Sequence, residues 1–398
     1  MTQEHLPVLF ETRSRTTPLR CPNSQQPAPD HLTGYYSNSI GQRILGVGMH
    51  NFGLMISSGA PMRAGGPDLP NGFGDMVAQA QWAEEKGFEC IWVGEGRLAS
   101  NGVIPMSVIA AYTKRIKIGS GILPYRTRNP ALLAVTAKTL DDLAPGRIRL
   151  GLGGWWEPLA TRVGLPNEKP LKAMREIVTV VRQLLNGEEV TYQGQFVDLD
   201  SVRFDGSSDD FGKSYPVEIH IGAVRMGMCA LSGEIADGCL LDFLVPPSYN
   251  DDALAAFQRG AEKSGRSLDD FQVPQLIAVS ANNEDPQQAI DDCKEFLTQY
   301  IAQQPHITEF CGADEELVAR IKSVMGWPAT KAQIHEAMKL VSNELTQSVA
   351  ACGSASDALD RISEWVDHGC TEPVLTPLGQ NAFGTLEQIA DAANLGSV

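Results

Sequence analysis

The segment from Ile116 to Leu159 constrains the fold more than any other part of the chain. It holds an apolar run, a turn broken by glycine and proline, an amphipathic pattern that Asn129 is placed to cap, and a second apolar run ending in glycines. Such runs predict parallel strands joined by a crossover helix, and glycines at a strand's carboxyl end leave room for a ligand. The segment therefore predicts part of a barrel-type active site.

The same alternation of apolar runs and helical patterns continues along the chain. Strands are expected at 43–49, 90–95, 116–122, 147–153, 217–223, 237–243, 273–280 and 372–378. Helices are expected at 72–87, 103–114, 130–143, 169–186, 225–235, 250–264, 286–304 and 384–395. Eight alternating units predict an α/β fold of the (β/α)8 TIM-barrel type, although a doubly wound open sheet is compatible with the same count.

The expected domain organisation is one barrel with additions. Residues 1–42 are rich in proline and polar residues and have no sustained period. We expect them to form an N-terminal arm that wraps the barrel or a partner subunit, and the assembly to be a homodimer or a higher homo-oligomer. The barrel spans 43–398, with insertions at about 187–216, as a hairpin, and at about 305–370, as extra helices.

Composition and charge exclude several classes of partner. The formal charge of −16 argues against nucleic acid and against an anionic membrane, since both require a basic surface. The eight cysteines show no CxxC pair and no regular spacing with histidine, so we expect free thiols, no bound metal and a reducing compartment. With neither a membrane-length apolar run nor a signal-peptide pattern, a cytoplasmic location is expected.

Several motifs resemble those of a known family and occur in the same order. GSGILPYRTRNPALLA, TLDDLAPGR and LGLGGWWEPLATRVGL are similar to segments of the luciferase-like flavin and deazaflavin oxidoreductases. HIGAVRMGMCALSGEIADG and EPVLTPLGQN are most similar to the branch typified by methylenetetrahydromethanopterin reductase, which uses the deazaflavin coenzyme F420. The resemblance covers roughly 43–395 and implies a barrel enzyme that transfers a hydride.

Two strand ends carry candidate catalytic residues, because barrel enzymes place the active site at the carboxyl ends of their strands. Glu95 follows an apolar strand and is a candidate general acid or hydrogen-bond acceptor for the coenzyme ring. His50 ends the expected first strand and is either a proton donor or a solvated or hydrogen-bonded loop histidine. The family usually has histidine where this chain has Gly96, so another group must transfer the proton or the substrate does not need it.

Two further strand ends supply candidate contacts to the coenzyme ring. By resemblance, Gly121 and Ile122 form a bulge that backs the middle ring and are joined by a non-proline cis peptide bond, whereas the residues alone also fit a simple turn. Gly153 and Gly154 end the fourth strand, and Trp155 follows as an aromatic wall able to stack on a ring.

The loop after the fifth strand is the candidate phosphate site. It opens a helix whose first N–H groups and dipole attract an anion, and the arginine in it adds positive charge. The resemblance places the coenzyme phosphate here, whereas a compact connection with a surface arginine is the alternative. The candidate residues are Gly222, Ala223, Val224, Arg225, Met226 and Gly227.

The first functional hypothesis is a coenzyme F420-dependent oxidoreductase that transfers a hydride between the deazaflavin and a small organic substrate. An FMN-dependent monooxygenase that uses reduced FMN and O₂ is the alternative, because the same barrel serves both cofactors. A non-catalytic ligand-binding barrel is a further alternative, supported by the missing histidine at Gly96. The long N-terminal arm and the sequence MHNFGLM argue against a methanopterin substrate.

Overall fold

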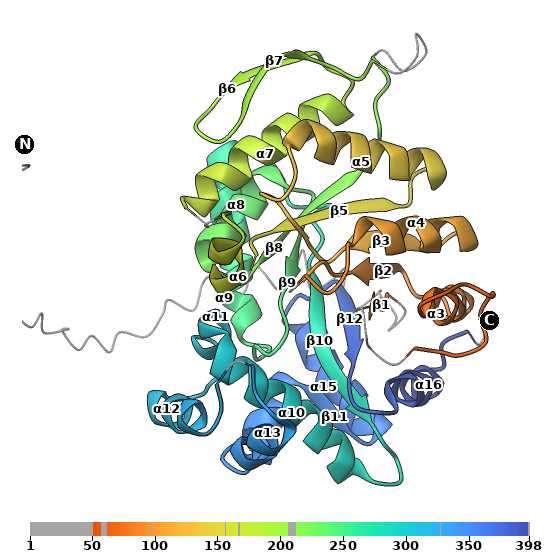
Figure 1. The fold of residues 1–398 in the computed structure, drawn as a ribbon, viewed down its shortest axis with the longest axis vertical. Coiled ribbons are helices and arrows are strands. Elements are labelled where there is room, and N and C mark those ends of the chain that lie inside the picture. The colour runs from red at the N-terminus through yellow and green to blue at the C-terminus, as the bar shows by residue number, and fades with distance from the viewer. Residues whose placement is uncertain are drawn as a thin grey trace, which may run out of the picture.

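A closed barrel of eight parallel strands lies at the centre of the described structure (Figure 1). The computed structural model describes residues 51–56, 62–96, 98–155, 157–165, 168–205, 212–326 and 328–396. The barrel strands are β1 (Gly53–Ile56), β2 (Cys90–Val93), β3 (Lys117–Ser120), β5 (Ile148–Gly153), β8 (Glu218–Ala223), β9 (Gly238–Leu241), β10 (Pro274–Ala281) and β12 (Glu372–Pro377). Because β10 pairs with β9 and β12, and β12 pairs with β1, the ring closes. The predicted (β/α)8 TIM barrel is confirmed.

The first barrel strand lies later in the sequence than predicted. The predicted range, 43–49, falls outside the described residues, whereas Gly53–Ile56 pairs with β2 on one side and with β12 on the other. Both segments are short apolar runs, and only pairing with two neighbouring strands distinguishes them. His50 therefore precedes the first barrel strand instead of ending it, and it too lies outside the described residues.

Helices surround the barrel as an outer layer. They are α3 (Phe73–Glu85), α4 (Val103–Tyr112), α5 (Pro130–Leu143), α7 (Pro170–Leu185), α8 (Met226–Ile235), α9 (Tyr249–Ser264), α15 (Ala355–Asp367) and α16 (Ala382–Ala392). Asn129 caps α5 as predicted, since its side chain accepts from the Ala131 N–H at 2.9 Å. In α7, Ile177, Val181 and Leu184 are buried at helical spacing. No described helix is both long and apolar enough to cross a membrane.

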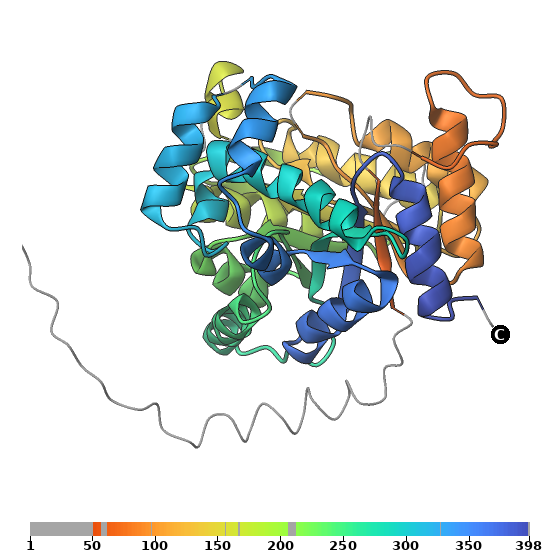
Figure 2. The ribbon, with the colours of Figure 1, turned by 90° about the horizontal axis from the view of Figure 1, so that it is seen from below.

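The first and last helices of this layer lie side by side, as Figure 2 shows for α3 and α16. The rings of Trp82 and Phe383 meet edge to face, with centroids 5.1 Å apart. Lys86 approaches Asp391 at 3.6 Å at the other end of the contact. Segments from opposite ends of the described chain thus complete the helical layer around the closed sheet.

Additional elements extend from two of the connections. The hairpin β6 (Val190–Gln193) and β7 (Asp198–Val202) follows α7, and α6 (Glu157–Arg162) precedes it. The longer excursion, between β10 and β12, contains α10 (Pro286–Gln303), α11 (Pro305–Thr308), α12 (Glu315–Val324), α13 (Lys331–Met338), α14 (Asn343–Val349) and β11 (Ala351–Gly353). Two short pairings, of β4 (Leu123–Pro124) with β5 and of β11 with β10, extend the sheet at its carboxyl side.

Helix α10 contacts residues at the carboxyl ends of two neighbouring strands, β10 and β9. Its Asp292 accepts from Ser280 near the end of β10 at 3.0 Å. Further along the helix, Phe296 and Tyr300 both meet the ring of Phe243, just beyond β9, with centroids 5.1 Å apart. The excursion therefore forms one rim of the barrel mouth.

A charged network fills the amino end of the barrel lumen. Arg149 of β5 donates to Glu372 of β12 at 2.5 Å and to Glu218 of β8 at 2.8 Å. Trp92 donates its indole N–H to the second oxygen of Glu372 at 2.7 Å. The Arg149 and Glu372 side chains are only 3% and 5% exposed, so removing Arg149 would leave the buried Glu372 without an ion-pair partner among the described residues. This end of the barrel serves stability, as is usual for the fold.

His220 lies next to this charged network in the barrel lumen. Its ring is fully buried and meets the Trp92 ring edge to face, with centroids 5.3 Å apart. Burial lowers the pKa of His220 to about 3, and the positive charge of Arg149 acts in the same direction. The imidazole is therefore neutral in the folded protein.

Candidate active site

Glycines line one side of the lumen near its carboxyl mouth. The adjacent strands β2, β3, β5 and β8 end at or next to Gly94, Gly121, Gly153 and Gly222. A Cβ added at Gly94 would lie 2.7 Å from the lumen side chain of Met55, and one added at Gly121 would lie 3.2 Å from Leu240. Side chains from other strands therefore pack directly over these glycines, and a larger residue would not fit there.

Ile122 forms the floor of this glycine-lined side. The Gly121–Ile122 peptide bond is cis, as the family resemblance implied. The Ile122 side chain covers two neighbouring strands, because a Cβ at Gly153 or at Gly222 would lie 2.6 or 2.7 Å from its carbons. The two glycines are thus explained by the space that Ile122 occupies.

Ser120 fixes the strand below this floor. Its hydroxyl donates to the Gly151 carbonyl and accepts from the Gly151 N–H, both at 2.8 Å. A side chain thereby replaces ladder hydrogen bonds between β3 and β5 at the level where their backbones separate. The position of Gly121 and Ile122 is consequently tied to β5.

Glu95, predicted as an acid or acceptor, is held in a bidentate ion pair. Arg128 donates to both carboxylate oxygens at 2.8 Å, and the Gly102 N–H donates to one of them at 2.7 Å. Burial opposes ionisation, but the bonds from Arg128 and Gly102 outweigh it and lower the pKa of Glu95. The carboxyl group is therefore ionised at neutral pH, which favours the acceptor or positioning role over the acid role.

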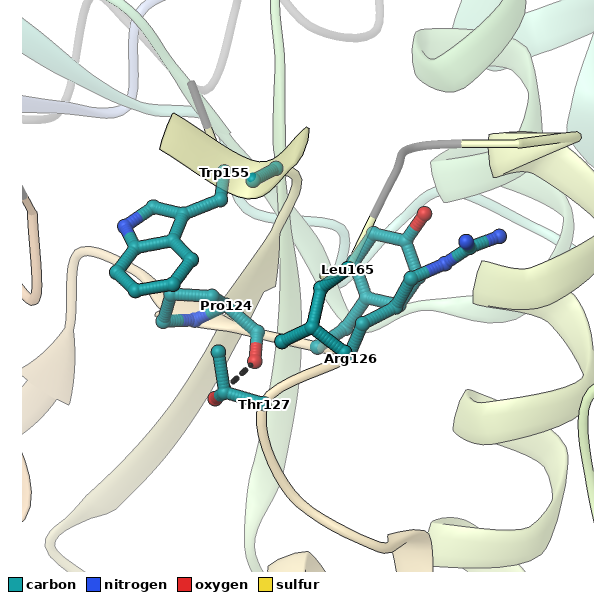
Figure 3. Close-up of a pocket in the computed structure, with 7 residues that line it drawn as sticks. Pro124, Arg126, Thr127, Trp155 and Leu165 are labelled. Atoms are coloured by element: carbon teal, nitrogen blue, oxygen red, sulfur yellow. Dashed lines mark hydrogen bonds between the residues drawn. The ribbon is translucent and has the colours of Figure 1, made fainter. Parts of the chain in front are cut away.

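Trp155 lines a small pocket between the loop after β4 and the α6 region (Figure 3). The indole is half-buried, and its N–H is shielded from solvent without a hydrogen-bond partner among the described residues. This N–H is therefore available to donate to an acceptor from water or from a ligand. Gly154 is exposed beside it. The pocket is lined by Pro124, Tyr125, Arg126, Thr127, Trp155, Ala160 and Leu165.

The candidate phosphate loop has the geometry of an anion site. Gly222 and Ala223 end β8, Val224 follows, and Met226 and Gly227 begin α8. The N-cap residue of this helix is Arg225, and no side chain of the described residues caps it. The first N–H groups of α8 are thus left for an anion.

Two contacts hold this loop in place. The Tyr249 hydroxyl, from α9, donates to the Val224 carbonyl. The Arg225 side chain is 64% exposed and pairs with Glu309, beyond α11, at 2.9 Å. An arriving phosphate would therefore compete with Glu309 for Arg225.

Asp242 lies at the mouth and was missed by the sequence analysis. Leu240 of β9 packs inside the barrel in a group of side chains that we call the lumen cluster, whereas Cys239 and Leu241 pack outside against α8 and α9. The lumen cluster consists of Met55, Cys90, Trp92, Leu240, Leu276 and Val374. Asp242 directly follows the last residue of β9, at the carboxyl side of the barrel. Its carboxylate is 3.9 Å from the His306 ring nitrogen of α11. An acidic residue ending an apolar strand was the available signal, the same one that singled out Glu95.

Thr376 is a second polar residue of the mouth that the sequence analysis missed. It lies two residues beyond Val374, a member of the lumen cluster on β12. The side chain is 8% exposed, and its hydroxyl has no partner in the described part of the chain. The described residues contain no group of three or more His, Cys, Asp or Glu side chains suited to a metal.

The sequence as a whole matches one family model. The model described as luciferase-like monooxygenase matches residues 50–372. This chain belongs to the luciferase-like monooxygenase family. The family predicted from the motifs is thereby confirmed.

Relatives of this luciferase-like protein carry the names of oxidoreductases. The 5,10-methylenetetrahydromethanopterin reductase of Archaeoglobus fulgidus is 29% identical over 326 residues, which cover 81% of this chain and 95% of the relative. An F420-dependent glucose-6-phosphate dehydrogenase of Nakamurella multipartita is 31% identical over 250 residues, covering 59% and 72%. The solved coenzyme F420-dependent tetrahydromethanopterin reductase of Methanopyrus kandleri shares the fold with a TM-score of 0.73 and 25% identity, covering 85% and 97%. The predicted similarity to the reductase branch is confirmed.

Proposed function

We propose that this protein is a coenzyme F420-dependent oxidoreductase that transfers a hydride between the deazaflavin and a small organic substrate. The observation that carries the proposal is the similarity to a methylenetetrahydromethanopterin reductase over 81% of the chain.

The residues of the mouth fit such a coenzyme from ring to phosphate. Ile122 would support the ring, and Trp155 would offer an N–H that has no partner among the described residues. The start of α8, which no described side chain caps, would hold the phosphate together with Arg225. The coenzyme supplies the hydride chemistry when it is bound. The chain orients the ring and excludes water from one of its faces. Glu95 keeps the Arg128 loop in place at the edge of the site.

FMN with O₂ is the second candidate, favoured by the monooxygenase description of the matching family. Both cofactors have a flat tricyclic ring and a phosphate, so the site described above fits either. Their chemistry differs, since a reduced deazaflavin passes a hydride and reacts little with O₂. Substrate turnover with F420 should therefore proceed without air.

An anaerobic titration separates the two candidates. The protein is mixed with reduced F420 or reduced FMN, ring absorbance is followed, and carbonyl, imine and unsaturated compounds are screened as acceptors. Oxidation of bound F420 by an acceptor without air is the expected result. Binding of FMN alone, with product formed only after O₂ is admitted, would replace this proposal by the monooxygenase. Failure to bind either would support the non-catalytic ligand-binding barrel.

We also propose a homodimer and a cytoplasmic location. Neighbouring helices α4 and α5 expose large apolar side chains to solvent, which a second copy of the chain would cover. The most exposed of them on these helices are Ile104, Leu132, Val135 and Leu143.

A further inference from the structure

The end of β2 offers no proton donor for the substrate. Glu95 is an ionised carboxylate bound by Arg128, and Gly96 has no side chain. Reduction of a carbonyl or imine nevertheless requires a proton as well as a hydride. If the chain supplies that proton, it must come from another strand end.

Asp242 lies at such a strand end, directly after β9. Leu240, two residues earlier on β9, is the side chain that a Cβ at Gly121 would meet at 3.2 Å. Asp242 lies two residues further toward the carboxyl end than Leu240, directly after β9. About a quarter of the carboxyl side chain, 27%, remains exposed, so a substrate can reach it.

The surroundings of Asp242 favour a carboxyl group that gains and loses a proton. The Phe243 N–H donates to Oδ1 at 3.0 Å, and the His306 ring is 3.9 Å from Oδ2. Of the other charged or titratable groups nearby, Arg225 is paired with Glu309 and the Tyr249 hydroxyl is bonded to the Val224 carbonyl. No arginine or lysine forms an ion pair with Asp242 among the described residues. Burial raises the pKa of Asp242 to about 6.

A second polar side chain, that of Thr376, lies near the carboxyl end of β12. Thr376 ends its strand with a hydroxyl that is buried and has no partner in the described structure. The two strands that carry Asp242 and Thr376 flank β10, in whose register Leu241 is level with Gln275 and Thr376 with Ala278. This hydroxyl is therefore available to bond with a polar atom of water or of a ligand on this side of the mouth.

We propose that Asp242 is the proton donor of the site, and this inference rests on the proposed function. In the reductive direction a C–H bond forms on the electrophilic carbon of the substrate as the C–H bond of the reduced coenzyme breaks. The π electron pair moves to the adjacent nitrogen or oxygen, which takes the proton of Asp242. The substrate is reduced by two electrons, the coenzyme is oxidised by two, and Asp242 becomes a carboxylate that regains its proton from water. In the oxidative direction the carboxylate accepts the proton.

The protonation of Asp242 is measured by infrared spectroscopy, which needs no turnover. Wild type, Asp242→Asn and the control Asp360→Asn, an exposed aspartate of α15, are titrated from pH 4 to pH 8. We expect a carboxyl C=O band with a midpoint near pH 6 in wild type and in the control, and its loss in Asp242→Asn. A wild type without this band, or a band that persists in Asp242→Asn, would overturn the proposal.

Oxidised F420 is then added to each protein at pH 6. The Asp242 band should shift on binding in wild type, whereas a carboxyl group remote from the coenzyme would not respond. With an acceptor found in the screen, Asp242→Asn should lower turnover by about 10²-fold or more and change the dissociation constant of F420 less than threefold. Asp242→Glu should recover part of the turnover.

The two proposals fail in different ways. If wild type does not bind F420, the proposed function is wrong, whatever the infrared titration shows. If wild type binds F420 while the band does not move, the role of Asp242 is wrong and the function stands. A purely structural role would lower F420 affinity and the unfolding midpoint of Asp242→Asn together with turnover, and this result would also overturn the proposal.

Discussion

Arg128 binds both carboxylate oxygens of Glu95 across 33 residues of sequence, with each N–O distance at 2.8 Å. The side chains are 18% and 11% exposed, so the pair is desolvated enough for its geometry to count. A double-mutant cycle with Glu95→Gln and Arg128→Gln should give a coupling energy of about 1–3 kcal/mol in urea unfolding. A coupling near zero would mean that the two side chains are independent in solution.

Substitutions at Gly153 and Ile122 should be coupled in their effect on the stability of the fold. An alanine Cβ at position 153 would lie 2.6 Å from Ile122, so Gly153→Ala should destabilise the fold by about 1–3 kcal/mol through overpacking. Adding Ile122→Ala should recover part of that loss, measured by thermal unfolding. Gly227→Ala is the control, because its Cβ would meet Leu171 at an ordinary 3.5 Å. Equal effects in both glycine variants would contradict the floor described here.

Stability should fall with acidification because of His220. Its pKa is lowered to about 3 in the folded protein, whereas an unfolded histidine titrates near ~6.5. The unfolded state therefore binds the extra proton between these values, so stability is fully present above pH ~6.5 and declines by up to about 1.4 kcal/mol per pH unit below it. Urea unfolding at several pH values should show a shallower decline in His220→Gln. His335→Gln, at an exposed position, should keep the wild-type slope.

The phosphate loop should respond to charge in two opposite ways. Arg225→Ala should weaken F420 binding by about 1–3 kcal/mol at low salt, and the difference should shrink at high salt. Glu309→Gln should strengthen binding, because it removes the carboxylate that pairs with Arg225 at 2.9 Å. Arg320→Ala, on the exposed face of α12, is the charge-matched control. Fluorescence titration of F420 measures all four proteins, and unchanged affinity in Arg225→Ala would return this arginine to a surface role.

The apolar surface of α4 and α5 should determine the subunit count. Ile104 and Leu132 are 58% and 61% exposed in the single chain. Replacing both by Glu should convert a dimer to a monomer, measured by light scattering, because charges would enter a desolvated interface. A double change at the exposed Lys322 and Arg320 of α12 should leave the mass unchanged. A wild-type monomer would contradict the proposed homodimer.

Sequence patterns predicted the strands and the glycine-ended mouth because both follow from local chemistry. Gly121, Gly153 and Gly222 interrupt apolar strands, where glycine is unfavourable unless backbone or ligand must come close. The first strand was misplaced because the runs at 43–49 and 53–56 are both apolar, and periodicity does not specify which one pairs with β2 and β12.

The residues that act through tertiary contacts were beyond the sequence. For Glu95 the acid and the acceptor roles both stayed open, because its ion-pair partner, Arg128, comes from another loop. Asp242 carried the same local signal, but its neighbour His306 lies on the excursion between β10 and β12, whose path over the strand ends has no local pattern. Thr376 stands out only because, once the fold is known, its hydroxyl has no partner among the described residues.

The network around Arg149 and Glu372 has a kinetic consequence. It fills the amino end of the lumen, so for the described residues the carboxyl mouth is the route by which ligands reach Ile122. Because the lumen has one opening, two reactants must enter it one after the other. The reactant that contacts Ile122 binds first and is released last. The single opening therefore sets the order of binding. An excess of the second reactant should slow the release of the first, because it blocks the carboxyl mouth.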